Sequence, residues 1–145
     1  MRSIVVADTI NTPSRITLDE LHKHLYIVGS GNHRIQRITL NKLLNATTVA
    51  GGNGFGANLN QLNYPQGIYF SEKTNSLYIA DQNNHRIVRW NIGATSGLII
   101  AGVSGQTVTS SKFLNISTDV VLNYNQSFLY VSDRGNQRIQ RFILV

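Results

Sequence analysis

Hydrophobic residues fall in short runs of four to six along the chain, rich in Val, Ile, Leu and Tyr, and clusters of Asn, Gly, Asp and Ser separate the runs. Such clusters favour turns, and the apolar spacing that an amphipathic helix requires is absent. The pattern therefore predicts short β-strands. In the middle of the chain it predicts four successive strands, at residues 66–70, 77–80, 86–91 and 98–101.

The same pattern occurs three times, at a spacing of 52 residues. LYIVGSGNHRIQR begins at Leu25, LYIADQNNHRIVR at Leu77 and LYVSDRGNQRIQR at Leu129. The first copy shares eight of these 13 residues with each of the others, whereas average composition gives roughly one match by chance. The repeats span about 14–65, 66–117 and 118–145, and residues 3–7 predict an outer strand of a preceding unit. Four antiparallel strands in a repeat of this length predict the blade of a β-propeller.

The repeated residues resemble the NHL family in Pro65-Gln66-Gly67-Ile68, Leu77-Tyr78-Ile79-Ala80-Asp81 and Asn84-His85-Arg86-Ile87. The resemblance covers nearly the whole chain. It implies an all-β fold, a β-propeller of NHL repeats with about three four-stranded blades, which is half of the six-bladed ring typical of this family. Two departures affect turn details: Gly29 replaces the aspartate of the motif, and Ser117 replaces the proline.

Residues kept in all three copies are expected to serve the blade itself. In the first copy they are Leu25, Tyr26, Asn32, Arg34, Ile35 and Arg37. The arginine stems are expected to lie along apolar surface while the guanidinium groups pair with carboxylates or carbonyls at the blade ends. Asp81 and Asp133 are the expected carboxylate partners, or else caps of the turn that follows them.

The loops between the second and third strands differ from copy to copy: GSGNH at 29–33, DQNNH at 81–85 and DRGNQ at 133–137. The family resemblance implies that these loops lie on the face that usually meets ligands. The candidate binding residues are Ser30, His33, Gln82, Asn83, His85, Arg134 and Gln137. The alternative is that these loops are ordinary solvated turns.

The net charge of +6 and the pI near 10.0 favour anionic partners. Six of the 13 basic residues, however, belong to the repeated motif. We expect a non-catalytic scaffold that binds a protein partner through its loops, as in ubiquitin ligases and uncharacterised proteins that carry NHL repeats. Binding of single-stranded RNA to a basic face is the alternative, with Tyr64 and Phe55 as the aromatic residues near the candidate loops.

Candidate catalytic and metal sites are weak. The chain has no cysteine, which excludes disulfides and thiolate zinc sites. The glycine-rich stretch at 51–56 lacks the following helix of a phosphate-binding loop, and His22 and His24 lack a third metal ligand. A lyase branch of the NHL family holds zinc with propeller histidines, but Gln137 interrupts the set formed by His33 and His85. We expect no enzyme, no cofactor and no metal, and a zinc-dependent lyase is the remote alternative.

No apolar run approaches the roughly 18 residues of a membrane span, so no membrane partner is expected. The apolar run at the N-terminus is shorter than that of a signal peptide, and the compartment is left open. Three blades cannot close a ring. The chain is therefore expected to be either a fragment of a longer chain or a homodimer that forms a six-bladed ring, in which the N-terminal strand of one copy completes the last blade of the other.

Overall fold

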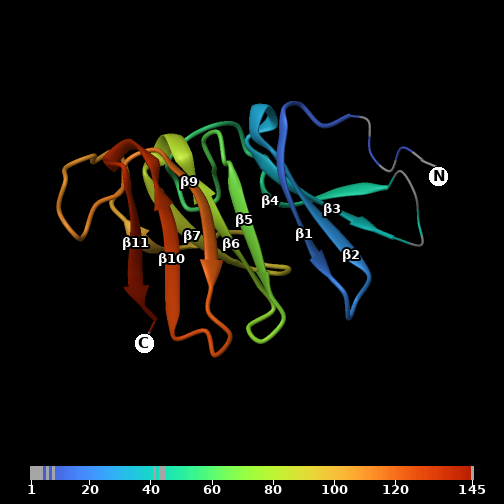
Figure 1. The fold of residues 1–145 in the computed structure, drawn as a ribbon. Coiled ribbons are helices and arrows are strands. Elements are labelled where there is room, and N and C mark those ends of the chain that lie inside the picture. The colour runs from blue at the N-terminus through green and yellow to red at the C-terminus, as the bar shows by residue number, and fades with distance from the viewer. Residues whose placement is uncertain (1–4, 6, 8, 41, 43–44, 145) are drawn as a thin grey trace.

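The computed structural model describes residues 5, 7, 9–40, 42 and 45–144. These residues form three antiparallel sheets (Figure 1). The first sheet contains β1 (Pro13–Asp19), β2 (His24–Gly29), β3 (Arg34–Thr39) and β4 (Ala46–Gly51). The second contains β5 (Gly67–Ser71), β6 (Ser76–Asp81), β7 (Arg86–Asn91) and β8 (Leu98–Gly102). The third contains β9 (Ser117–Leu122), β10 (Phe128–Asp133) and β11 (Arg138–Ile143).

The predicted all-β propeller fold is confirmed. Each sheet is a meander in which strands adjacent in sequence pair, and the four strands predicted in the middle repeat agree with β5 to β8 to within one residue at each end. The third blade has three strands within the described residues. The outer strand predicted at 3–7 falls mostly on residues outside the described part of the chain, so it stays a prediction.

A short 3₁₀ turn joins the second and third strands of every blade. These turns are η1 (Ser30–Asn32), η2 (Gln82–Asn84) and η3 (Arg134–Asn136). Each ends at a residue in the left-handed region, with φ of 52° at His33, 55° at His85 and 52° at Gln137. None of the three is glycine, so the backbone conformation recurs although glycine would adopt it with less strain.

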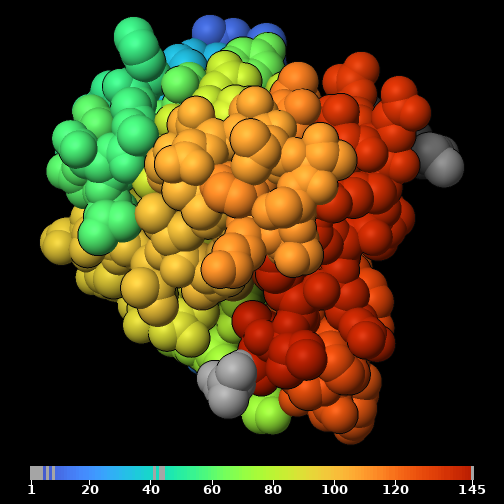
Figure 2. All heavy atoms as spheres, turned by 90° about the vertical axis from the view of Figure 1, so that its left-hand side faces the viewer, coloured from blue at the N-terminus to red at the C-terminus, as the bar shows by residue number. Residues whose placement is uncertain are grey.

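The blades stand side by side in an arc, with β1, β5 and β9 as neighbouring inner strands (Figure 1). The three 3₁₀ turns lie at one end of the blades, together with the connections 52–66 and 103–116. This end is called the loop face below. At the outer rim, the loop 103–113 lies over the boundary between the segments that contain β8 and β11 (Figure 2, orange between yellow and red).

Two apolar cores hold the arc together, one at each boundary between blades. The first joins Tyr26, Val28 and Ile35 of the first blade to a larger set in the second blade: Ile68, Phe70, Leu77, Ile79, Val88 and Trp90. The second core joins residues on the other side of the second blade, such as Tyr78 and Ile87, to Val120, Leu129 and Val131 of the third. The middle blade is therefore covered on both faces, which explains why simple alternation is weak in β6 and β7.

Candidate functional site on the loop face

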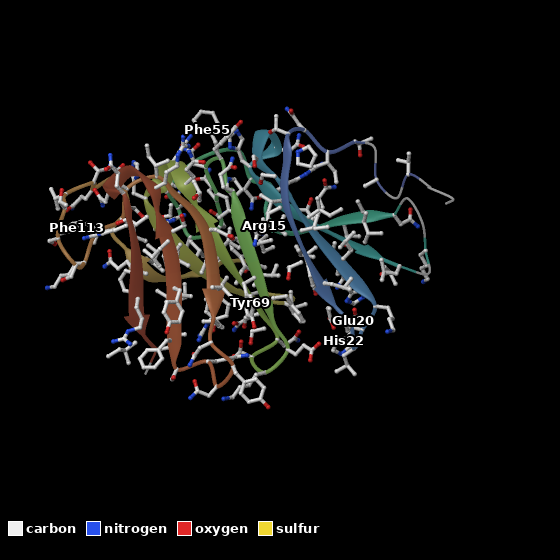
Figure 3. All side chains as sticks on the ribbon, in the orientation of Figure 1. Arg15, Glu20, His22, Phe55, Tyr69 and Phe113 are labelled. Atoms are coloured by element: carbon white, nitrogen blue, oxygen red, sulfur yellow. The ribbon has the colours of Figure 1, made fainter. Side chains whose placement is uncertain are left out.

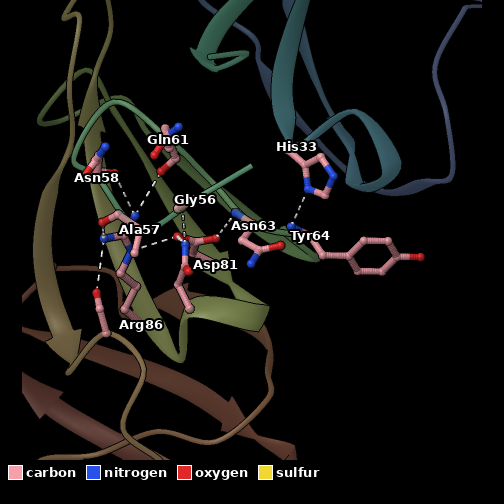
Figure 4. Close-up of polar contacts among 11 residues, drawn as sticks. His33, Gly56, Ala57, Asn58, Gln61, Asn63, Tyr64, Asp81 and Arg86 are labelled. Carbon is pink, nitrogen blue, oxygen red and sulfur yellow. Dashed lines mark hydrogen bonds and ion pairs between the residues drawn. The ribbon is translucent and has the colours of Figure 1, made fainter. Parts of the chain in front are cut away.

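A buried arginine fixes the loop face of the second blade (Figure 4). Arg86 opens β7 and is fully buried. Its Nε donates to Asp81 Oδ2 at 2.8 Å. Its two terminal nitrogens donate to carbonyl oxygens of the preceding connection, those of Ala57, Asn58 and Gln61 at 2.6, 3.2 and 3.0 Å. The pairing of Arg86 with the Asp81 carboxylate and with backbone carbonyls agrees with the prediction from the sequence, and the contacts with Ala57, Asn58 and Gln61 tie the blade to the connection that precedes it.

Asp81 accepts hydrogen bonds on both carboxylate oxygens. Oδ1 accepts the backbone N–H of Asn63 at 2.7 Å, and Oδ2 accepts the Asn84 amide at 2.8 Å as well as the guanidinium of Arg86. Burial raises the pKa of this carboxyl, while the three donors oppose that shift. The side chain is completely buried, so its role is to position the loop face and not to contact a ligand.

The third repeat builds the same anchor, and the first repeat does not. In the third, Arg138 Nε lies 2.7 Å from Asp133 Oδ2, and Asp133 Oδ1 accepts the N–H of Asn115 at 2.6 Å. In the first, the aspartate is replaced by Gly29, and the corresponding backbone N–H is accepted by Asn32 Oδ1 at 2.8 Å. The Nε of Arg34 is buried and has no hydrogen-bond partner among the residues that the structure describes.

Two of the predicted binding residues, His33 and His85, join neighbouring blades. Nδ1 of His33 accepts the backbone N–H of Tyr64 at 3.0 Å, and Nδ1 of His85 accepts that of Ile116 at 3.2 Å. An imidazole nitrogen accepts a hydrogen bond only when it carries no proton, and both nitrogens of a charged ring carry one. These two hydrogen bonds therefore require neutral rings. Burial lowers the pKa of His85, which favours the neutral form, although Asp133 and Asp81 oppose the shift.

Ser30, a third predicted binding residue, is buried at the boundary between the first two blades. Its Oγ lies 2.6 Å from the carbonyl oxygen of Pro65 and 2.9 Å from Ser14 Oγ. It also accepts a hydrogen bond from the Gln66 side chain at 3.3 Å. The four other predicted residues, Gln82, Asn83, Arg134 and Gln137, are partly or fully exposed on the loop face. The seven residues therefore divide into an inter-blade group and a surface group.

An aromatic cluster lies on the loop face, formed by Phe55, His33 and Tyr64. The centre of the Phe55 ring lies 5.5 Å from the centre of the His33 ring. The centre of the Tyr64 ring lies 6.4 Å from the same point. Phe55 lies at the loop end of the blades (Figure 3), and its side chain is 70% exposed although hydrogen bonds hold its loop in place. Asn84 Nδ2 donates to Gly56 O at 2.7 Å, and the Gly56 N–H donates to Leu62 O. We call Phe55, His33 and Tyr64 the Phe55 cluster.

The Phe55 cluster combines residues that are far apart in the sequence, at 33, 55 and 64. Phe55 and Tyr64 are recognisable in the sequence as aromatic residues near the candidate loops, but their contact with His33 depends on bringing the connection 52–66 against the end of η1. A sequence signal was available, because the second repeat keeps the glycines of this connection at Gly102 and Gly105 but has Gln106 at the position of Phe55.

The histidines of the first hairpin surround a carboxylate. Asp19 is buried, and its Oδ2 lies 2.9 Å from His22 Nδ1 and 3.6 Å from His24 Nδ1. Burial lowers the pKa of His24, and nearby Arg37 lowers it further. Within the described ranges, no group of three or more His, Cys, Asp or Glu side chains is arranged to hold a metal ion.

In the same part of the chain, no helix has the length and apolarity needed to cross a membrane.

Solved structures similar to this chain show the same architecture. The fold matches a chain from the crystal structure of a nidogen/laminin complex with a TM-score of 0.70 and 17% identity, over 94% of this chain and 44% of that one. It also matches an auxiliary nutrient binding protein from Bacteroides thetaiotaomicron with a TM-score of 0.66 and 17% identity, over 87% of this chain and 36% of that one. The blades and their repeated anchors thus define a β-propeller protein.

Sequence comparison narrows the class. The NHL repeat model matches residues 62–90, which include Asp81 and Arg86. NHL repeat-containing protein 2 of Gallus gallus is 29% identical over 117 residues, and that of Bos taurus is 36% identical over 81. These alignments cover 77% and 52% of this chain, but the chain spans only 16% and 11% of those relatives. The chain thus carries an NHL repeat at residues 62–90 and is similar to NHL repeat-containing proteins.

Proposed function

We propose that this chain is a non-catalytic binding module that holds a protein partner on its loop face. The observation that carries the proposal is the Phe55 cluster: a large apolar ring, 70% exposed, on a loop whose carbonyl oxygens accept hydrogen bonds from the buried Asn84 and Arg86 side chains. Rigid aromatic side chains dominate the energy of many protein interfaces, because they bury a large area and lose little conformational entropy on binding.

The surroundings of Phe55 suit such an interface. The side chains of residues that the three repeats share, such as Asn84 and Arg86, are occupied by buried contacts. The residues that differ, such as Asn83 and Arg134, are exposed on the same face. An aromatic anchor with a polar rim is the usual anatomy of a protein–protein interface. Variation among repeats then gives the partner one orientation on an otherwise repetitive scaffold.

The comparisons support this class of function. NHL propellers serve in general as protein-binding scaffolds, and one structural relative comes from a complex of nidogen with laminin. The fold alone does not name a partner. The chain spans only 16% of its relative from Gallus gallus, so the proposal concerns this propeller segment alone.

Affinity capture with matched variants tests the proposal. The 145-residue chain, its Phe55→Ser variant and its Leu21→Ser variant would be immobilised and exposed to the same cell extract, with bound proteins identified by mass spectrometry. Leu21 is 72% exposed in a hairpin away from the loop face, so it matches Phe55 in exposure. We expect a set of proteins that the wild type and Leu21→Ser retain and Phe55→Ser loses. Equal capture by all three would reject the Phe55 cluster as the binding site.

Binding of single-stranded RNA is a second candidate, favoured by the same aromatic cluster, because bases stack on exposed rings. The structure leaves fewer basic groups available to phosphates than the net charge of +6 suggests. Arg86 and Arg138 spend their guanidinium groups on aspartates and backbone carbonyls, so they are not free for phosphates. Titration with labelled poly(U) at rising salt tests this candidate. RNA binding through phosphates weakens steeply with salt, and no binding or salt-independent binding rejects it.

A further inference from the structure

The loop that carries Phe55 also contains the one Asn-Gly pair of the sequence, Asn53-Gly54. Both residues of the pair are exposed. Asparagine is one of the thermolabile residues of proteins, because its side-chain amide can react with the backbone nitrogen of the residue that follows. The two reacting groups belong to neighbouring residues, so the reaction is intramolecular and needs no enzyme. The local structure decides how readily it proceeds.

Gly54 presents its backbone nitrogen without obstruction. Its φ is +73°, in the left-handed region that glycine adopts without strain. A Cβ built on Gly54 would meet no atom within 4 Å, so nothing packs against this side of the backbone. Within the part of the chain that the structure describes, the Gly54 N–H donates no hydrogen bond to another backbone group. Base can therefore remove the proton of this nitrogen, as the attack on a neighbouring amide requires.

Two hydrogen bonds restrain Asn53. Its side-chain Nδ2 donates to the carbonyl oxygen of Asn60 at 3.0 Å, and its own carbonyl oxygen accepts Gln61 Nε2 at 3.0 Å. The second bond holds the peptide unit whose nitrogen belongs to Gly54, so it opposes the rotation that brings this nitrogen against the side chain. Both bonds are at exposed positions, where water can replace them. They slow the approach of the reacting groups without preventing it.

The reaction has two steps. The deprotonated nitrogen of Gly54 forms a bond to Asn53 Cγ, and the bond from Cγ to Nδ2 breaks, so ammonia leaves with the proton and a cyclic imide remains. Water then adds to one of the two imide carbonyls and breaks the bond of that carbon to nitrogen. Opening at Cγ gives aspartate. Opening at the backbone carbon gives isoaspartate, which has an additional methylene in the main chain. Neither step needs an oxidant or a reductant.

We propose that Asn53 is a site of spontaneous deamidation on the loop face, and that the hydrogen bond from Gln61 sets its rate. The consequence for binding rests on the proposed function. Either product places an exposed carboxylate two residues before Phe55, on a face whose repeated aspartates, Asp81 and Asp133, are completely buried. A carboxylate beside an apolar anchor must lose hydration when a partner covers it, so the modified loop should bind the partner less tightly.

Mass spectrometry of the incubated protein tests the chemistry. Trypsin cleaves after Lys42 and Lys73, and no lysine or arginine lies between them. The resulting peptide carries Asn53 and two matched controls, Asn58 and Asn60, which are exposed in the same loop. In the folded 145-residue chain at neutral pH, Asn53 should convert to aspartate and isoaspartate at least about tenfold faster than either control, a ratio that a barrier lower by about 1.4 kcal/mol produces.

A substitution of Gln61 tests the role of the structure. Gln61→Leu removes the donor to the Asn53 carbonyl and should speed the conversion about fivefold, as expected for the loss of one net hydrogen bond. Gln82→Leu, on the same face, is the matched control and should leave the rate unchanged. Circular dichroism would show that each variant is folded. Equal rates at Asn53 and at the two control asparagines, or equal rates in the wild type and Gln61→Leu, overturn the proposal.

Affinity capture from a cell extract measures the effect on partner binding. Asn53→Asp copies the charge of the product, whereas Asn53→Gln keeps a neutral amide. We expect Asn53→Asp to retain clearly less of the proteins that depend on Phe55 than Asn53→Gln does, and equal capture would reject the effect on the partner. If no captured protein depends on Phe55, the proposed function fails, but the conversion of Asn53 is still measured in the tryptic peptide. The two proposals can therefore fail separately.

Discussion

Arg15 and Asp119 occupy equivalent positions in the first and third repeats, and their side chains meet in an ion pair of 2.9 Å between Nη1 and Oδ2. The equivalent position in the second repeat, midway between them, is Gly67. A Cβ at Gly67 would lie 2.5 Å from the Cα of Asp119 and 2.7 Å from the carbonyl oxygen of Thr118. The inner strands approach this closely because the middle position has no side chain, and two blades that are not sequence neighbours can then touch.

Gly67→Ala is expected to destabilise the chain by about 1–3 kcal/mol, because the added methyl group overlaps backbone atoms that can move only if β5 and β9 separate. Chemical unfolding monitored by circular dichroism measures the effect. Arg15→Ala is the control, since a half-exposed ion pair contributes less than about 1 kcal/mol. If the two variants lost the same stability, the close approach at Gly67 would not be the constraint.

Arg86→Met is expected to cost about 3–5 kcal/mol, because it leaves the buried Asp81 carboxylate without its charge partner. Arg34→Met should cost clearly less, since Gly29 stands at the aspartate position of the first repeat and the Arg34 Nε has no hydrogen-bond partner within the described part of the chain. The two substitutions change the same atoms at equivalent positions, so each is the control for the other. Equal losses in urea unfolding would contradict the role of the aspartate.

Gly29→Asp should transfer the missing anchor into the first repeat. Gly29 has φ −93° and ψ 85°, close to the −85° and 79° of Asp81, so the backbone already accepts an aspartate. Its Cβ would lie 3.3 Å from the Ile10 side chain, which must give slightly. In this background Arg34→Met should cost at least about 1 kcal/mol more than in the wild type, as measured by a double-mutant cycle. A coupling near zero would mean that the pair does not form.

Stability should fall as the pH drops from 7.5 to 5.5. Burial lowers the pKa of His85 below its ordinary 6.5, so the unfolded chain binds protons in this range more readily than the folded chain. The contribution of His85 is therefore fully present above pH 6.5 and is lost as the pH falls toward the lower folded value. His85→Gln, which copies the third repeat, should reduce this pH dependence in urea unfolding. An unchanged dependence would assign it to other groups, such as His24.

The fold and the pairing of the repeated arginine with its aspartate could be predicted from the sequence, because both depend on residues within one repeat. The strands of the middle blade and the pairing of Arg86 with Asp81 depend on residues close in sequence, and the period of 52 residues shows which of them recur. The contact of Arg15 with Asp119 could not be predicted, because the three equivalent positions share no residue type. The burial of Ser30 was also missed, since its variation among repeats resembles that of an exposed loop residue.

The hydrogen bonds of His33 and His85 run in one direction along the arc, from each blade to the amide of the next. Opening of one blade therefore frees a backbone amide in its successor, and not in its predecessor. Amide exchange at Tyr64 should report the opening of the first blade, and exchange at Ile116 that of the second. The inter-blade hydrogen bonds thus give the arc a direction. Local opening that starts in one repeat should spread toward the C-terminus one blade at a time.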